Sequence, residues 1–213
     1  TVPILGTSVT DYASALEIDN WSGTVGGNIS GTSDLAPLDQ QAAMLQELFP
    51  NAKKVGLLFC SSEANSKYQV DEVTKLLTAA GLTCTEFSFT DSNDVSSVTQ
   101  SACDNSDVIF IPTDNTAASN TEAIANVVLA SNTPVIARES GLCKGCGVAT
   151  LSIDYYELGK ITGQMAADVL TGKADISTPA VKTAPTSTKQ ANMANCQKLG
   201  ITVPAEYTAL ATE

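Results

Sequence analysis

Lys54-Val-Gly-Leu-Leu-Phe-Cys60 is the stretch that indicates the fold most directly. Its residues 55–60 carry no charged side chain, and lysines precede them while serines follow. A short, continuously apolar run of this kind is typical of a parallel strand that is covered on both faces. Val108-Ile-Phe-Ile111 repeats the pattern further along the chain. The sequence therefore predicts a buried parallel sheet.

Similar apolar runs alternate with segments of helical period along the rest of the chain. We predict strands at residues 2–7, 54–60, 83–89, 108–111, 134–137, 148–153 and 180–183. Apolar residues spaced three or four apart predict helices at residues 38–48, 70–80, 116–130 and 158–171. Because strands and helices alternate, the predicted fold class is α/β, with Rossmann-like parallel sheets and flanking helices.

Length and charge narrow the function classes. The 213 residues suffice for one domain or two small lobes. Eleven basic against 23 acidic residues give a net charge of -12, and Arg138 is the only arginine, so a nucleic-acid backbone would be repelled. Histidine is absent, which removes the usual general base near neutral pH and the commonest metal ligand. We therefore expect no nucleic-acid partner and a low chance of catalysis.

Both the start of the chain and its apolar runs bear on localisation. No apolar run approaches the roughly 18 to 20 residues that a membrane-spanning helix needs. The chain opens Thr1-Val-Pro-Ile-Leu-Gly6, which has neither a charged segment nor an apolar segment of a targeting signal. A strand predicted from the first residues suggests truncation.

Six cysteines allow several interpretations. Cys60, Cys84, Cys103 and Cys196 stand singly in apolar or amphipathic stretches, where a thiol is typically a small buried hydrophobe. The remaining pair is Cys143-Lys-Gly-Cys146, and the neighbouring glycines predict a loop for this segment. A loop disulfide, two free thiols, or a metal or redox pair remain as alternatives. No histidine or second close cysteine pair is present to complete a zinc site.

Polar loops follow several predicted strands. They lie at residues 7–12, 61–66, 112–116, 138–140 and 154–156. Each offers hydroxyls, amides or carboxylates beside the free N–H groups of a helix start, a combination that binds a carboxylate or hydroxyl ligand. Plain helix capping is the alternative for each loop. Since ligands of parallel sheets bind at the carboxyl ends of the strands, five such loops favour a site at this edge.

The glycine-rich segment 21–33 does not match a phosphate-binding loop. Its glycine spacing differs from a P-loop and the lysine is missing, so we interpret it as a flexible crossing segment. We expect no cofactor and no metal.

Several stretches resemble one known family. They are residues 26–34 (Gly-Gly-Asn-Ile-Ser-Gly-Thr-Ser-Asp), 49–56 (Phe-Pro-Asn-Ala-Lys-Lys-Val-Gly), 61–66 (Ser-Ser-Glu-Ala-Asn-Ser), 112–115 (Pro-Thr-Asp-Asn), 153–159 (Ile-Asp-Tyr-Tyr-Glu-Leu-Gly) and 199–204 (Leu-Gly-Ile-Thr-Val-Pro). In this order they resemble the ABC transporter substrate-binding proteins of the periplasmic binding protein type I fold. The resemblance is to the subgroup associated with tryptophan and other aromatic amino acids.

The resemblance implies two Rossmann-like lobes that hold a ligand in the cleft between them. Residues 1–30 and 150–178 correspond to remnants of the first lobe, and residues 31–149 and 179–213 to the second lobe. By this resemblance we expect a truncated first lobe, because the family places roughly a hundred further residues before the position of Thr1. The chain thus resembles the C-terminal two-thirds of such a protein.

The resemblance also implies a set of ligand-binding residues. They are Ser8, Thr10, Glu63, Asn65, Ser66, Asp114, Asn115, Glu139 and Asp154. Among these types, Asp114 suits an ammonium group, Asn115 both gives and accepts one bond, and the helix start at Asn65 and Ser66 suits a carboxylate. Tyr12, Tyr155 and Tyr156 are candidates to stack on an aromatic ring of the ligand.

The expected function is that of an extracytoplasmic solute-binding protein of an ABC importer, without enzymatic activity. Its ligand is an amino acid, aromatic by the resemblance, and its partner is a membrane permease. The family implies a location in the periplasm or a lipid anchor, as a lipoprotein, on the outer face of the cell membrane. A sensor or regulatory domain of the same fold is the alternative, and a hydrolase-type enzyme based on Glu63, Asp114 or Asp154 is a weaker one.

Overall fold

The structure is a computed structural model that describes residues 2–210. It divides into two compact units: Thr1–Ala36 with Ile153–Ser187 (unit 1), and Pro37–Ser152 with Thr188–Glu213 (unit 2). Residue 1 of the predicted first lobe and residues 211–213 of the predicted second lobe lie outside the described residues. The assignment of the units to lobes of a larger protein stays a prediction.

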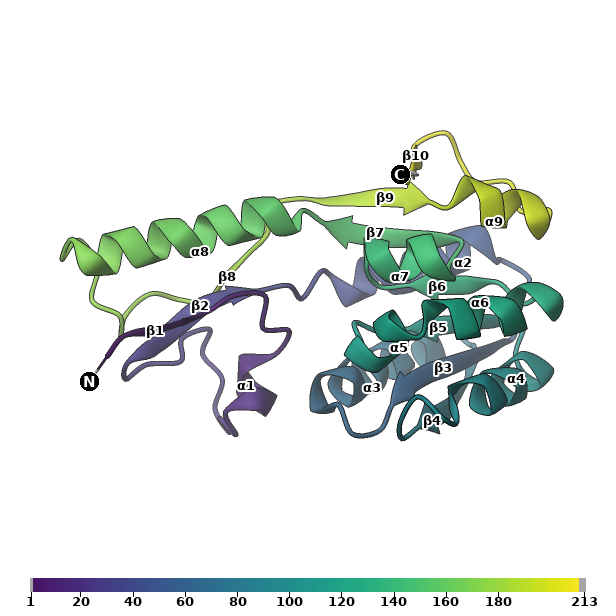
Figure 1. The fold of residues 1–213 in the computed structure, drawn as a ribbon, viewed down its shortest axis with the longest axis horizontal. Coiled ribbons are helices and arrows are strands. Elements are labelled where there is room, and N and C mark those ends of the chain that lie inside the picture. The colour runs from purple at the N-terminus through teal and green to yellow at the C-terminus, as the bar shows by residue number, and fades with distance from the viewer. Residues whose placement is uncertain (1, 211–213) are drawn as a thin grey trace. The chain divides into compact units, whose positions relative to one another are not determined.

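Unit 2 is built on the parallel sheet that the apolar runs predict (Figure 1). Within the described residues it has seven strands in the order β10-β9-β7-β6-β5-β3-β4. Their bounds are β3 Lys54–Cys60, β4 Thr83–Phe89, β5 Val108–Ile111, β6 Val135–Ala137, β7 Ala149–Ile153, β9 Ser187–Ala191 and β10 Thr208–Ala209. The pairings β3–β4, β3–β5, β5–β6, β6–β7 and β9–β10 are parallel.

Helices cover both faces of this sheet, as a continuously apolar strand requires. The helices of unit 2 are α2 Leu38–Leu48, α3 Ala64–Ala79, α4 Val95–Asn105, α5 Asn115–Ser119, α6 Thr121–Ala130, α7 Ser140–Gly145 and α9 Met193–Lys198. Val55, Leu57 and Phe59 face a core with α2, α3 and α9, whereas Leu58 and Cys60 face a second core with α4 to α7. Successive residues of β3 therefore bury their side chains on opposite faces.

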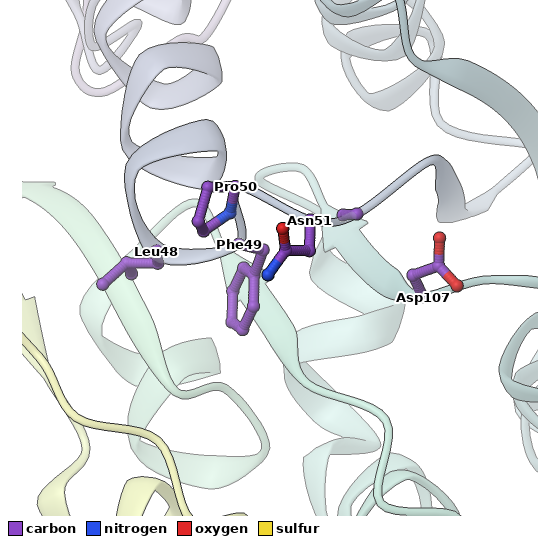
Figure 2. Close-up of a pocket in the computed structure, with 6 residues that line it drawn as sticks. Leu48, Phe49, Pro50, Asn51 and Asp107 are labelled. Atoms are coloured by element: carbon purple, nitrogen blue, oxygen red, sulfur yellow. The ribbon is translucent and has the colours of Figure 1, made fainter.

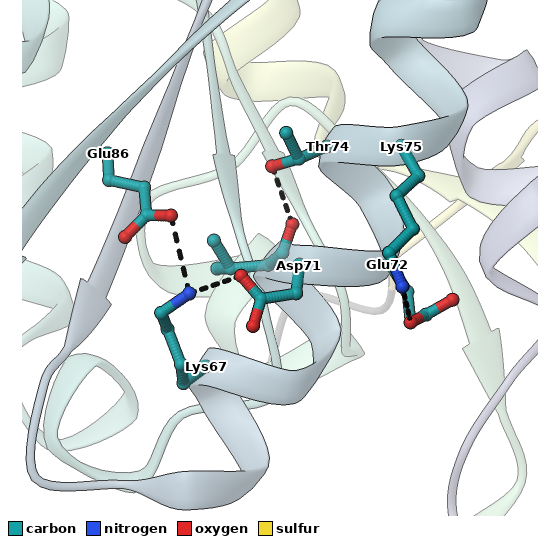
Figure 3. A network of polar contacts seen from close by, with 7 residues as sticks. Lys67, Asp71, Glu72, Thr74, Lys75 and Glu86 are labelled. Atoms are coloured by element: carbon teal, nitrogen blue, oxygen red, sulfur yellow. Dashed lines mark hydrogen bonds and ion pairs between the residues drawn. The ribbon is translucent and has the colours of Figure 1, made fainter.

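Ion pairs on the surface of α3 add little to this core (Figure 3). Lys67 contacts Asp71 on the same helix and lies 3.4 Å from Glu86 of β4, the edge strand. Lys75 Nζ lies 2.6 Å from Glu72 Oε1. All of these side chains are at least 37 % exposed, and exposed pairs contribute at most about 1 kcal/mol each. The stability of unit 2 comes from its two apolar cores.

Unit 1 contains, within the described residues, a three-stranded sheet in the order β1-β2-β8. Its elements are β1 Ile4–Gly6, α1 Tyr12–Ala15, β2 Ile29–Ser33, α8 Tyr155–Leu170 and β8 Lys182–Thr183. β2 pairs in parallel with both β1 and β8. Helix α8 packs on this sheet, where Thr162 Oγ1 lies 2.7 Å from Thr32 Oγ1.

The structure corrects four sequence interpretations. The end of the supposed flexible segment 21–33 is strand β2, in which Ser30 and Thr32 are buried. The sequence did not predict this strand, because its small polar residues and glycine are typical of loops. The Cys143–Cys146 segment is not a loop either, since α7 begins at Ser140 and Cys146 forms its C-cap. The predicted helix at residues 116–130 is interrupted at Asn120, and the structure adds α4, which the sequence did not predict.

Candidate functional site

Three strands of unit 2 deliver their loops to one edge of the sheet. β3, β5 and β6 are adjacent and parallel, so residues 61–66, 112–116 and 138–140 follow their carboxyl ends. The first two loops contact each other directly. Asn65 Nδ2 donates to the Thr113 carbonyl at 2.9 Å, and Ser66 Oγ donates to the same oxygen at 3.3 Å. The predicted edge site therefore brings these loops together.

Arg138 and Gln69 form the buried base of this edge. The Gln69 side chain is fully buried, and its amide donates to the carbonyls of Asn65 and Thr113. Its Oε1 accepts hydrogen bonds from Thr113 N at 3.0 Å and from Arg138 Nη1 at 2.8 Å. Arg138 Nη1 also donates to Thr113 Oγ1 at 2.9 Å, and the residue is 2 % exposed. Two neutral acceptors thus hold Nη1 of the chain's only arginine.

Asp114 links the end of β3 to the start of α5. Its Oδ2 accepts a hydrogen bond from Cys60 N at 2.7 Å, and its Oδ1 accepts one from Ala117 N at 2.8 Å. Burial raises the pKa of the Asp114 carboxyl, although these bonds oppose the shift. The residue is 1 % exposed. Its predicted role toward an ammonium group stays a prediction, while its role as a helix cap is visible.

Glu63 reaches from the β3 loop to the start of α5. Oε2 accepts from both N and Nδ2 of Asn115, each at 2.9 Å. Oε1 accepts from Thr116 N at 2.9 Å and from Thr116 Oγ1 at 2.8 Å. Burial alone would raise the pKa of Glu63, but the four hydrogen bonds outweigh it and lower the pKa below its ordinary value. The carboxylate therefore fills the positive end of α5.

The lowered pKa of Glu63 predicts acid sensitivity. A carboxyl whose folded-state pKa is depressed stabilises the fold above its ordinary pKa of about 4.3, and this stability is lost as pH falls through the folded pKa. We expect Glu63→Gln to cost about 1 kcal/mol at pH 7, as loss of a helix cap does. We also expect the variant to lose less stability than wild type on acidification below about pH 5.

Urea unfolding between pH 3 and pH 7 measures both effects. Glu122→Gln is the matched control, because Glu122 is exposed in the first turn of α6 and the substitution removes the same charge. If the free energy of unfolding falls equally steeply below about pH 5 in Glu63→Gln and in wild type, the lowered pKa of Glu63 is contradicted.

The other predicted carboxylates also cap helices. Glu139 accepts from Gly141 N and Leu142 N at the start of α7. Asp154 Oδ1 accepts from Tyr156 N at 2.9 Å and from Glu157 N at 3.1 Å at the start of α8. Capping, the alternative interpretation of these loops, is thus present at each of them. Their roles in ligand binding stay predictions.

Ser8, Thr10 and Asp154 belong to unit 1, whereas the other predicted residues belong to unit 2. Ser8 has a φ of +56°, which is uncommon for a residue other than glycine, and its N–H donates to Thr32 Oγ1 at 3.3 Å. Thr10 is 7 % exposed, and its carbonyl accepts from Ser33 Oγ at 2.9 Å. The first-strand loop is therefore fixed against the carboxyl end of β2.

All six cysteines are free thiols, and five of them are buried. Burial raises the pKa of Cys143 well above its usual value and that of Cys146 to about 12. A redox-active thiol pair needs the opposite, a lowered pKa and access to solvent. Within residues 2–210 no group of three or more cysteine or acidic residues is arranged to hold a metal ion. Cys143 and Cys146 therefore pack as buried side chains in the hydrophobic core.

A surface hollow of about 320 Å³ lies elsewhere on unit 2 (Figure 2). Its lining residues are Leu48, Phe49, Pro50, Asn51, Ala52 and Asp107. Residues 48–52 precede β3 and Asp107 precedes β5, so the hollow is at the amino ends of the strands. Ligands of parallel sheets bind at the opposite edge, and we therefore do not assign the ligand to this hollow.

Sequence reasoning overlooked three residues that build the edge site, namely Gln69, Thr113 and Arg138. One signal was available for Gln69, since it is a polar residue four positions before Val73, on the apolar stripe of α3. Arg138 carried another signal, because the single arginine of an acidic chain directly follows a predicted strand. Neither signal specifies that the two side chains bond each other.

Parallel α/β units whose strand ends carry polar loops define a ligand-binding protein of the Rossmann-like class. The family model of ABC transporter substrate binding proteins matches residues 1–213. The chain therefore belongs to the ABC transporter substrate-binding protein family, as its sequence motifs predicted. This is a family of extracytoplasmic substrate-binding proteins, not of enzymes. No helix within residues 2–210 has the length and apolar character needed to cross a membrane.

Relatives of known structure and function support the same assignment. The chain is 34 % identical over 173 residues to a tyrosine-binding protein of Clostridioides difficile. The matched region covers 81 % of this chain and 50 % of that protein. It thus spans half the length of this curated relative. The ABC domain in complex with L-Trp from Streptococcus pneumonia has a TM-score of 0.89 and 32 % identity, over 98 % of this chain and 73 % of that one.

A conserved domain protein of Vibrio cholerae has a TM-score of 0.90 and 31 % identity, over 98 % of this chain and 71 % of that one. These structures have the periplasmic binding protein type I fold, which confirms the predicted fold class.

Proposed function

We propose that this chain binds an aromatic α-amino acid as the receptor of an ABC importer. The observation that carries the proposal is the similarity, at 32 to 34 % identity, to a tyrosine-binding protein and to a protein in complex with L-Trp. In the full-length protein the ligand is held in a cleft between two lobes and handed to a membrane permease. The permease and a lipid anchor on the outer face of the membrane rest on the family alone.

The edge site of unit 2 offers a place for the ligand carboxylate. Helix α3 begins at Ala64, and no side chain of the described residues caps its first turn. A helix start of this kind attracts an anion through its N–H groups and its dipole. Arg138, held by Gln69 and Thr113, adds a positive charge at the same strand ends. We propose that Asn65 and Ser66, with Arg138 beneath them, hold the carboxylate.

The remaining predicted residues enter the proposal in supporting roles. Glu63, Asp114, Asn115 and Glu139 shape the loops around this edge through their hydrogen bonds. Ser8, Thr10 and Asp154 do the same for the loops of unit 1. Tyr155 and Tyr156 are exposed and present rings for the aromatic part of the ligand.

Titration calorimetry and thermal unfolding of the full-length protein test this function. We expect L-tryptophan or L-tyrosine to bind saturably, and a ligand at 100 times its Kd to stabilise the fold by about 2.7 kcal/mol. L-Lysine, L-aspartate and glucose are the controls, and we expect none of them to stabilise it. Absence of stabilisation by every aromatic amino acid would contradict the proposal.

A further inference from the structure

Asp34 of unit 1 is a buried carboxylate that the polypeptide satisfies only in part. The residue is 6 % exposed, and its Oδ2 accepts a hydrogen bond from Tyr155 Oη at 3.0 Å. Its Oδ1 is enclosed and has no hydrogen-bond partner among residues 2–210. Enclosing a carboxylate oxygen without a donor is costly. Oδ1 is therefore an acceptor for which residues 2–210 supply no donor.

Asp34 lies at the edge of the unit 1 sheet that is formed by the carboxyl ends of its strands. It directly follows β2, at the carboxyl end of the strand. Ser33, the preceding residue, donates through Oγ to the carbonyl of Thr10 on the neighbouring strand's loop. Val9 N donates to the Thr32 carbonyl at 3.1 Å in the same region. Ligands of open parallel sheets bind at such strand ends, so Asp34 stands where a ligand is expected.

Charge selects the kind of donor. None of the ion pairs formed within residues 2–210 includes Asp34. A buried carboxylate is stabilised best by a cationic donor, because a charge-assisted hydrogen bond is about twice as strong as a neutral one. The α-ammonium of an amino acid carries both the charge and the N–H groups that Oδ1 needs.

Asp114 is the other buried acidic side chain of the described residues, and it serves as a contrast. Both of its oxygens already accept backbone N–H groups, from Cys60 and Ala117. Asp34, in contrast, has one oxygen committed to Tyr155 and one remaining. Of the two, only Asp34 has an oxygen to which no described residue donates.

We propose that Asp34 Oδ1 accepts a hydrogen bond from the α-ammonium group of the ligand, while Tyr155 holds the carboxylate in position. This inference rests on the proposed function, because it needs an amino acid as the ligand. Oδ1 is enclosed, so a ligand reaches it only by displacing the groups that cover it.

A matched pair of ligands tests the contact in the full-length protein. Indole-3-propionate differs from L-tryptophan by the missing α-amino group, and 3-(4-hydroxyphenyl)propionate differs from L-tyrosine in the same way. We expect wild type to bind the amino acids about 10- to 100-fold more tightly than these analogues, the usual range for a hydrogen bond to a charged group. Asp34→Asn should weaken amino-acid binding by a similar factor and leave analogue binding nearly unchanged.

Asp19→Asn is the control, since Asp19 is exposed in unit 1 and loses the same charge. Thermal unfolding without ligand verifies that each variant is folded. Failure of wild type to bind either amino acid overturns the proposed function and this inference with it. If wild type binds the amino acids and Asp34→Asn prefers them over the analogues as strongly as wild type does, the inference is wrong while the proposed function stands. Oδ1 would then bind a water molecule and not the ligand. Equal wild-type affinity for amino acid and analogue overturns it without recourse to a variant.

Discussion

Gly31→Ala is expected to destabilise unit 1 by about 3 kcal/mol or more, the sum of backbone strain and overpacking. Gly31 has a φ of +151°, which side chains rarely adopt. A Cβ at this position would overlap the carbonyl oxygen of Gly6 and the hydroxyl of Tyr12. Neither neighbour has room to move. Gly6 is paired with Gly31 across β1 and β2, and the Tyr12 hydroxyl donates to the Thr32 carbonyl.

Gly163→Ala provides the matched control within the same unit. Gly163 lies in α8, and a Cβ there meets no atom within 4 Å. Alanine in a helix is favoured over glycine by about 1 kcal/mol, so this variant should be slightly more stable than wild type. Thermal and urea unfolding followed by circular dichroism compare the two variants. A Gly31→Ala protein as stable as wild type would show that β1 and β2 pair differently.

Gly31 also shows which parts of the fold the sequence could predict. The strands of unit 2 were evident because β3 and β5 are buried on both faces, and a short, continuously apolar run is typical of such a strand. Strand β2 is also largely buried, but its central residues are Ser30, Gly31 and Thr32. Their polar groups are satisfied by partners distant in sequence, such as Pro179 for Ser30 and Thr162 for Thr32. Such a strand is recognisable only once its partners are known.

Helix α4 was missed for a related reason. Its sequence, Val-Ser-Ser-Val-Thr-Gln-Ser-Ala-Cys-Asp-Asn, is rich in residues that favour caps and turns. Val95, Thr99 and Ala102 nevertheless share one buried face of the helix. Thr99 satisfies its hydroxyl by donating to the Val95 carbonyl one turn earlier. Packing against the sheet outweighs the weak helix propensity here.

The candidate site was predictable at the level of loops and not of individual contacts. Parallel topology alone places the loops after β3, β5 and β6 at one edge, and the structure brings them together. The sequence did not show which acidic residues cap helices and which are available to a ligand, because an acidic residue after a strand is compatible with both roles. Asp114 accepts backbone N–H groups from Cys60 and Ala117, whereas Asp34 Oδ1 accepts none from the described residues.

Asp114→Ala is the second substitution expected to have a large effect, about 2 to 4 kcal/mol of lost stability in unit 2. The truncation leaves the N–H groups of Cys60 and Ala117 without their acceptor in a buried environment. Each such orphaned donor costs about 1 to 3 kcal/mol. Removing the carboxylate also removes the cost of burying its charge, which is what raises the pKa of Asp114, so the net loss is smaller than the two penalties combined.

Asp107→Ala is the control that shows whether the stability loss in Asp114→Ala is caused by burial or by the loss of hydrogen bonds alone. Asp107 Oδ2 also accepts two backbone N–H groups, from Lys53 at 2.7 Å and from Lys54 at 2.8 Å. This residue is exposed beside the hollow of Figure 2, so water replaces the lost acceptor. We expect Asp107→Ala to cost about 1 kcal/mol or less, the net value of an ordinary hydrogen bond. Equal losses in the two variants, measured by urea unfolding at pH 7, would mean that the burial of Asp114 adds nothing to its contribution as a cap.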